Sequence, residues 1–151
     1  MFGKLEAVPV TLETASQVFP LARSLVPELE LDGWLAFARR QIERPETAGI
    51  VGVRDERGYF HGLFNYEVRH DVRTGPILDV GMAMAVNLLD RAGAGAVLVR
   101  AIDAMAVALG CAGTQIRLTA EQRQLRRWLE GEGHALRCVV LEKAIAAASA
   151  H

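Results

Sequence analysis

A short run of glycine, alanine and two charged residues, DRAGAG at positions 90–95, separates two apolar stretches of the chain. The stretch before it, residues 77–89, reads as a strand, and the stretch after it, residues 96–109, reads as a helix. The first N–H groups of a helix lack partners within it, and its dipole is positive at that end, so the junction suits an anion. Glycines there let a phosphate approach the backbone closely. A plain strand-to-helix connection uses the same residues, and this alternative stays open.

The strand at residues 77–89 has two unlike sets of side chains. Its even-numbered residues are all large and apolar, whereas its odd-numbered residues between 79 and 87 are small or polar. Because side chains alternate along a strand, we expect Asp79 to share a face with Ala83 and Ala85. Such a face packs closely against a helix, or leaves a shallow groove for an extended ligand. A carboxylate beside that groove is a candidate general base.

Two other groups are candidate bases, and a third has a different expected role. His61 and Glu67 share one face of a strand at residues 59–69, where the alternative is an ordinary exposed position on a sheet. His134 follows a glycine at the end of a helix, and we expect it to contact carbonyl groups of that helix. The two cysteines, Cys111 and Cys138, form no cluster with metal-ligand spacing, and we expect no metal site.

Length and composition indicate one domain over residues 1–151. The chain is 51% hydrophobic and 23% charged, with a formal net charge of -1. This balance supplies no basic field for nucleic acid or for an anionic membrane. The start of the chain lacks the long apolar run of a signal peptide, and no run approaches the ~20 residues of a membrane span. We therefore expect a cytoplasmic protein.

The remaining elements follow from periodicity and capping signals. We expect a strand at 6–12, a helix opened by a capping box of Thr14 and Gln17, and a second helix at 32–44. A hairpin then turns at 55–58, with Gly58 at a position that favours positive φ. After the helix at 96–109 we expect a strand at 114–118, a helix opened by a capping box of Thr119 and Gln122, and a last strand at 136–141.

The predicted order is therefore β-α-α-β-β-β-α-β-α-β. Hairpins come first and a βαβ crossover follows. This order predicts an α/β (α+β) fold, with a mixed, mostly antiparallel sheet flanked by helices.

Nearly the whole chain resembles the GNAT superfamily of N-acetyltransferases, both in the predicted order of its elements and in the loop at residues 90–95. The family binds the pyrophosphate of acetyl-CoA with a loop of the form [Q/R]-x-x-G-x-[G/A]. Two registers match here. With Gly93 and Gly95 at the small positions, Asp90 stands where the family has Arg or Gln; with Arg91 leading, Ala94 and Ala96 take the small positions. The first register places Leu98 and Val99 where the family carries paired leucines.

The resemblance implies that an acceptor amine attacks the thioester of acetyl-CoA directly, with no metal, and that Asp79 is the base. Backbone groups of the fourth strand would bind the pantetheine arm and polarise the thioester. The implied cofactor-binding residues are Met84, Ala85, Val86, Arg91, Ala92, Gly93, Ala94, Gly95 and Ala96. The partners implied are a small-molecule or peptide amine and a second copy of the chain, as a homodimer.

One departure from the family concerns the general acid. Residues 126–134, RRWLEGEGH, are similar to a family segment in which a tyrosine protonates the leaving thiolate, and Leu129 stands at that tyrosine. The chain would need another acid, such as water, or would be a non-catalytic domain that binds CoA or another ligand, or acts through dimerisation.

Overall fold

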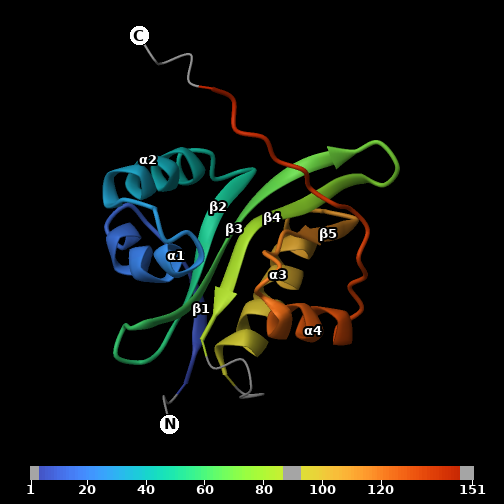
Figure 1. Cartoon of the computed structure of the whole chain (residues 1–151). Coiled ribbons are helices and arrows are strands. Elements are labelled where there is room, and N and C mark those ends of the chain that lie inside the picture. The colour runs from blue at the N-terminus through green and yellow to red at the C-terminus, as the bar shows by residue number, and fades with distance from the viewer. Residues whose placement is uncertain (1–3, 87–92, 147–151) are drawn as a thin grey trace.

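The computed structural model describes residues 4–86 and 93–146, which are built on a five-stranded sheet (Figure 1). The spatial order of its strands is the chain order, and only the last neighbours pair in parallel. The strands are β1 (Glu6–Pro9), β2 (Ala48–Arg54), β3 (Phe60–Asp71), β4 (Gly75–Ala85) and β5 (Gly113–Ile116). The helical elements are the 3-10 turn η1 (Ala15–Val18), α1 (Phe19–Leu25), α2 (Leu31–Ile42), α3 (Ala94–Ala108) and α4 (Arg123–Gly131). This confirms the predicted class of fold, a mixed and mostly antiparallel sheet flanked by helices.

Helices cover both faces of the sheet and form two cores (Figure 1). On one face, α1 and α2 enclose Trp34 and Leu63, and the indole N–H of Trp34 donates to the carbonyl of Ala15 at 2.7 Å. On the other face, α3 and α4 enclose Phe64 and Leu98. Within the described part of the chain, no helix is long and apolar enough to cross a membrane.

A β-bulge interrupts β4 at Gly81. Tyr66 of β3 lies opposite Val80, and the preceding residue, Asn65, lies opposite Met82, so Gly81 has no residue opposite it. An extra residue in one strand moves every later side chain to the other face of the sheet. Before the bulge the even-numbered residues of β4 face the core under α3, and after the bulge the odd-numbered residues face it.

The bulge overturns the predicted alternation along this strand. Ala83 and Ala85 pack into the core under α3, while Met84 turns toward α1 and α2. Asp79 lies opposite Glu67, whose side chain contacts α2. The expectation that Asp79 shares a face with Ala83 and Ala85 is therefore wrong, because the bulge inserts Gly81 as an extra residue between Asp79 and the two alanines.

Both predicted capping boxes differ in the structure. Thr14 forms no side-chain cap, and its hydroxyl instead accepts the N–H of Thr11 at 2.9 Å. In the second box, the N–H of Thr119 donates to Oε1 of Gln122 at 3.0 Å, but α4 begins only at Arg123. Gln122 thus stands before the helix, with its amide nitrogen available for another contact.

The predicted last strand is absent from the described chain. Residues 135–146 form no helix or strand, and Leu136 and Leu141 are 69% and 90% exposed. The local pattern is that of a strand, but a strand also needs a neighbouring edge to supply its hydrogen bonds.

Candidate functional site

Strands β4 and β5 separate halfway along β4. They pair only from Ile77 to Val80 of β4, and the N–H of Arg117 adds one bond to the carbonyl of Val80 at 2.9 Å. Beyond this point β4 continues to Ala85 beside β3, and no strand of the described chain pairs with its other edge. We call this opening the β4–β5 split.

The direction of the peptide groups shows which atoms face the split. The N–H of Val86 donates to the carbonyl of His61 at 2.8 Å and so points toward β3. Because successive peptide groups of a strand point to opposite edges, those of Ala83 and Ala85 face the split. The side chain of Gln122 confirms this, since its Nε2 donates to the carbonyl of Ala83 at 2.7 Å. The N–H of Ala85 is left facing the opening.

A cavity of about 300 Å³ lies at the split. It is bordered by the end of β4, by α1 and by the start of α4, and its lining residues are Leu25, Met84, Ala85, Glu121, Gln122, Arg123, Gln124 and Leu125. Arg123 and Gln122 were not among the site residues expected from the sequence. No local pattern marks them, because they reach the cavity only through the docking of α4 on β4.

The second half of the glycine-alanine loop forms the N-cap and the first turn of α3. Gly93 is the N-cap residue with extended backbone angles (φ −88°, ψ −163°), and Ala94, Gly95 and Ala96 form the buried first turn. The N-cap supplies no side-chain hydrogen bond. Gly93 therefore leaves the first-turn N–H groups without a side-chain cap of its own, which suits an anion. Two predicted contacts, Arg91 and Ala92, lie outside the described residues.

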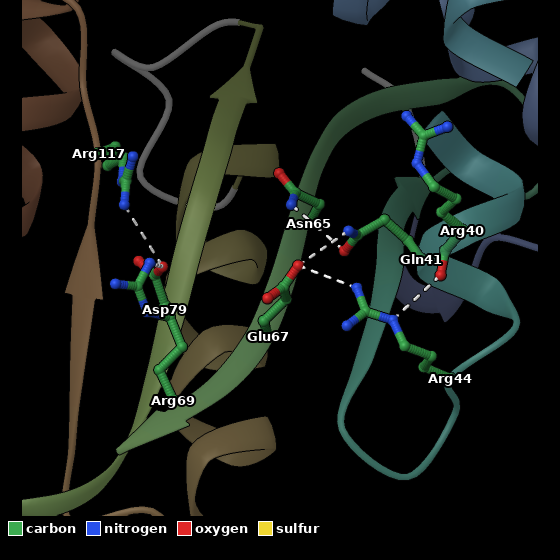
Figure 2. Close-up of polar contacts among 8 residues, drawn as sticks. All are labelled: Arg40, Gln41, Arg44, Asn65, Glu67, Arg69, Asp79 and Arg117. Carbon is green, nitrogen blue, oxygen red and sulfur yellow. Dashed lines mark hydrogen bonds and ion pairs between the residues drawn. The ribbon is translucent and has the colours of Figure 1, made fainter. Parts of the chain in front are cut away.

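A row of polar side chains lies on the α2 side of the sheet (Figure 2). Oε2 of Glu67 accepts hydrogen bonds from Nε2 of Gln41 at 3.2 Å and from Nη2 of Arg44 at 3.1 Å. The bond from Gln41 lowers the pKa of Glu67, with Arg44 adding to this effect and burial opposing it. Glu67, one of the candidate bases, is therefore a weaker base than an ordinary glutamate.

Asp79, the expected base, is held between two arginines (Figure 2). Its Oδ2 lies 2.8 Å from Nη1 of Arg69 and 3.7 Å from Nη2 of Arg117. The residue is 8% exposed, whereas both arginine side chains are more than half exposed. The carboxylate thus sits in an ion-pair network beside the last paired residues of β4 and β5.

Asn65 lies beside the bulge and has an unsatisfied amide oxygen. Its Nδ2 lies 3.5 Å from Oε1 of Gln41, and its buried Oδ1 has no hydrogen-bond partner among the described residues. A Cβ atom added to Gly81 would lie 3.3 Å from this amide. The bulge therefore brings a buried acceptor atom to the place where β4 and β5 separate.

His61 and His134, the two histidines singled out in the sequence, have different hydrogen-bond partners. Nε2 of His61 lies 2.8 Å from Oδ2 of Asp55, and this hydrogen bond is the main reason that the pKa of Asp55 is lowered. Nδ1 of His134 lies 3.1 Å from the carbonyl oxygen of Leu129 in α4, which confirms the expected contact with a helix carbonyl. Its Nε2 lies 3.0 Å from the hydroxyl of Thr114 on β5.

Two further expectations concern acids and metals. Leu129, at the position of the family's tyrosine, is buried in the core under α3. No group of three or more His, Cys, Asp or Glu residues in the described chain is placed to hold a metal ion.

The lowered pKa of Glu67 makes a prediction about stability. Because the folded pKa lies below the ordinary value of 4.5, the stabilisation from this group is complete above about pH 4.5 and is lost as the pH falls through the folded pKa. We expect Glu67→Gln to lower the free energy of unfolding at pH 6 and to make little difference at pH 3. Urea unfolding of both proteins at the two pH values measures this. A difference that grows toward pH 3 would contradict it.

No family model matches the sequence, and no curated protein matches it. Solved structures do match. The complex of AAC(6')-Iy with the bisubstrate analogue CoA-S-monomethyl-acetylneamine has a TM-score of 0.77 at 15% identity, covering 95% of this chain and 100% of that one. Aminoglycoside 6'-N-acetyltransferase AAC(6')-Ih from Acinetobacter baumannii has a TM-score of 0.76 at 16% identity, with the same coverage. A ribosomal-protein-alanine N-acetyltransferase from Brucella melitensis biovar Abortus 2308 has a TM-score of 0.72 at 15% identity, covering 94% of this chain and 100% of that one. The chain therefore has the GNAT fold, as the resemblance in the sequence implied.

Proposed function

We propose that the chain is a cytoplasmic N-acetyltransferase, a single acyl-CoA-binding domain over residues 1–151. It would transfer the acetyl group of acetyl-CoA to a primary amine of an acceptor that remains to be identified. The observation that carries this proposal is the β4–β5 split, where the N–H of Ala85 points into an opening with a cavity beside it. Solved structures of the same fold include acetyltransferases in complex with CoA or a CoA analogue, which supports acetyl-CoA as the co-substrate.

Acetyl-CoA would bind along the split. We infer that its pyrophosphate lies on the N–H groups of Ala94, Gly95 and Ala96, beside Gly93 and the loop that contains Arg91 and Ala92. The pantetheine arm would run along the end of β4, over the region of Met84, Ala85 and Val86. The N–H of Ala85 would donate to the thioester carbonyl, and this polarisation grows in value as the carbonyl oxygen gains charge in the transition state.

The acceptor would enter from the α2 side, where the polar row ends at Asn65. Its amine nitrogen attacks the thioester carbon, the C–N bond forms and the C–S bond breaks. Asp79 takes the amine proton through a chain of water molecules, because it lies six residues from Ala85 along β4. No tyrosine stands at Leu129, so the CoA thiolate takes its proton from water. The buried Oδ1 of Asn65 supports this entry side, since an amine or a water molecule would satisfy it.

The assignment of Asp79 as the base has its own test. We expect Asp79→Asn to lower kcat about 100-fold, at the lower end of the range for general acid–base catalysis. Arg69→Gln breaks the shorter ion pair but keeps the carboxylate, and is the matched control. Rates measured from pH 5 to 9 decide. If Asp79→Asn keeps the rate and pH profile of the unaltered chain, the residue is only an ion-pair partner.

A second candidate is a non-catalytic domain of the same fold that binds CoA. The observation in its favour is the buried Leu129, which leaves the usual acid position without a hydroxyl. Calorimetric titration with acetyl-CoA tests both candidates, and absence of binding at millimolar ligand would exclude both. Release of free CoA thiol in the presence of a panel of amines, amino acids and peptides then separates them. Binding without thiol release would favour the non-catalytic domain.

A further inference from the structure

The cavity at the β4–β5 split is lined by apolar side chains and by two charged ones. Leu125 is buried and Leu25 and Met84 are half-buried, whereas Glu121 and Arg123 are exposed. Its volume of about 300 Å³ is at the lower end of the ~300–1,000 Å³ that is typical of pockets for small molecules. The cavity therefore suits one compact ligand that has both an apolar part and charged groups.

The two charged residues are held at the cavity by the residue between them. Gln122 is bonded through both atoms of its side-chain amide. Its Oε1 accepts the N–H of Thr119 at 3.0 Å, and its Nε2 donates to the carbonyl of Ala83 at 2.7 Å. These bonds fix the start of α4 against β4. Glu121 and Arg123 flank Gln122 in the sequence, so they are held at the same place.

Glu121 and Arg123 have no charged partner in the part of the chain that the structure describes. No hydrogen bond or ion pair joins either side chain to another described residue, although the two stand only two positions apart. The carboxylates of the polar row differ, since Glu67 and Asp79 are both paired with arginines. An unpaired acid and an unpaired base at one cavity can each bind an opposite charge of a ligand.

We propose that this cavity binds the acceptor, and that the acceptor is an α-amino acid with an apolar side chain. Glu121 binds its ammonium group and Arg123 binds its carboxylate. Because one residue separates Glu121 from Arg123, the two charges of the ligand must also be close together, as they are on a single α-carbon. The apolar side chain packs against Leu25 and Met84, and its burial stabilises the complex.

This inference rests on the acetyltransferase function proposed above. Ala85 also lines the cavity, so an amino acid bound there has its amino group beside the strand that would hold the thioester. A polyamine suits the cavity less well, because Arg123 would repel its second positive charge. The acceptor class is therefore set by the start of α4 rather than by the polar row.

The first test compares leucine, leucine amide and glycine as acceptors in the thiol-release assay with acetyl-CoA. Leucine amide lacks the carboxylate, and glycine lacks the apolar side chain. We expect kcat/KM for leucine to exceed both of the others by about tenfold, which is the effect of one lost hydrogen bond to a charged group or of one lost apolar contact. Equal values for leucine and leucine amide would overturn the proposal.

Variants of the two charged residues locate the effect. Arg123→Gln should lower kcat/KM for leucine about tenfold and leave that for leucine amide unchanged, whereas Glu121→Gln should lower both. The matched control is Arg127→Gln, because Arg127 is an exposed arginine one turn further along α4 that does not line the cavity. This control should keep the preference for leucine. Weaker binding of acetyl-CoA by Arg123→Gln would mean that this arginine contacts the cofactor, and would also overturn the proposal.

Calorimetric titration with leucine in the presence of excess CoA separates this proposal from the function on which it rests. Suppose that leucine binds the unaltered chain, binds Arg123→Gln about tenfold more weakly, and causes no thiol release. The cavity would then be upheld as an amino-acid site and acetyl transfer would be refuted. Thiol release from other amines without any binding of leucine would overturn the amino-acid site and leave the acetyltransferase function standing. Absence of both binding and thiol release would overturn both.

Discussion

Gly93→Val is expected to weaken the binding of acetyl-CoA by about 10- to 100-fold. The glycine is buried but has extended backbone angles, which valine adopts readily, so the backbone itself does not oppose the change. Its branched side chain would instead stand beside the first-turn N–H groups and keep a phosphate away from them. Each hydrogen bond lost to a charged group costs about 1.5–3 kcal/mol, and 1.4 kcal/mol corresponds to a tenfold change in affinity. Calorimetric titration measures the change.

The control for this variant is Gly113→Val. Gly113 lies on β5 with open space where its Cβ would be, and valine favours strands. We expect this variant to bind acetyl-CoA as the unaltered chain does. Equal affinities for Gly93→Val and Gly113→Val would mean that the start of α3 is not the phosphate site.

Ala85→Pro is expected to lower kcat by about 100- to 1000-fold, the usual cost of removing one preorganised donor to a developing oxyanion. Proline removes the N–H of Ala85, which faces the split, and leaves the N–H of Val86 bonded to His61 on β3. The strand should therefore keep its pairing on that side. Single-turnover rates of thiol release measure the effect, and the melting temperature checks the fold.

Ala85→Gly is the partner experiment, because it removes the methyl group and keeps the N–H. We expect it to retain most of the activity. If the glycine variant were as slow as the proline variant, the loss would come from the side chain or from the strand, and the role of this N–H would be refuted.

Features encoded by neighbouring residues could be predicted from the sequence. The turn at 55–58 forms with Gly58 at φ 91°, as its composition indicated. The glycine-alanine loop does precede a helix, and Gly93 to Ala96 are its N-cap and first turn. These elements depend on turn chemistry and on apolar periodicity within a few residues, so a single sequence contains the signal for them.

Features that depend on contacts between distant segments could not be predicted. The bulge at Gly81 is a mismatch of register between β3 and β4, and within β4 the glycine itself is only a weak local sign of it. The cavity position of Arg123 depends on how α4 docks. Whether residues 136–141 form a strand depends on which strand edge is available beside them. In each case the determining partner lies on another element.

The hydrogen bond from Gln122 to the carbonyl of Ala83 has a consequence for the energetics of ligand capture. The carbonyl oxygen of Ala83 would accept a hydrogen bond from β5 if the two strands continued to pair along β4. Because Gln122 already donates to this oxygen, its side chain helps to keep the two strands apart. The β4–β5 split is therefore open before a ligand binds, and the free energy needed to separate the strands is supplied by folding. A ligand that lies there meets a preorganised surface, and little of its binding free energy is diverted into rearranging the protein.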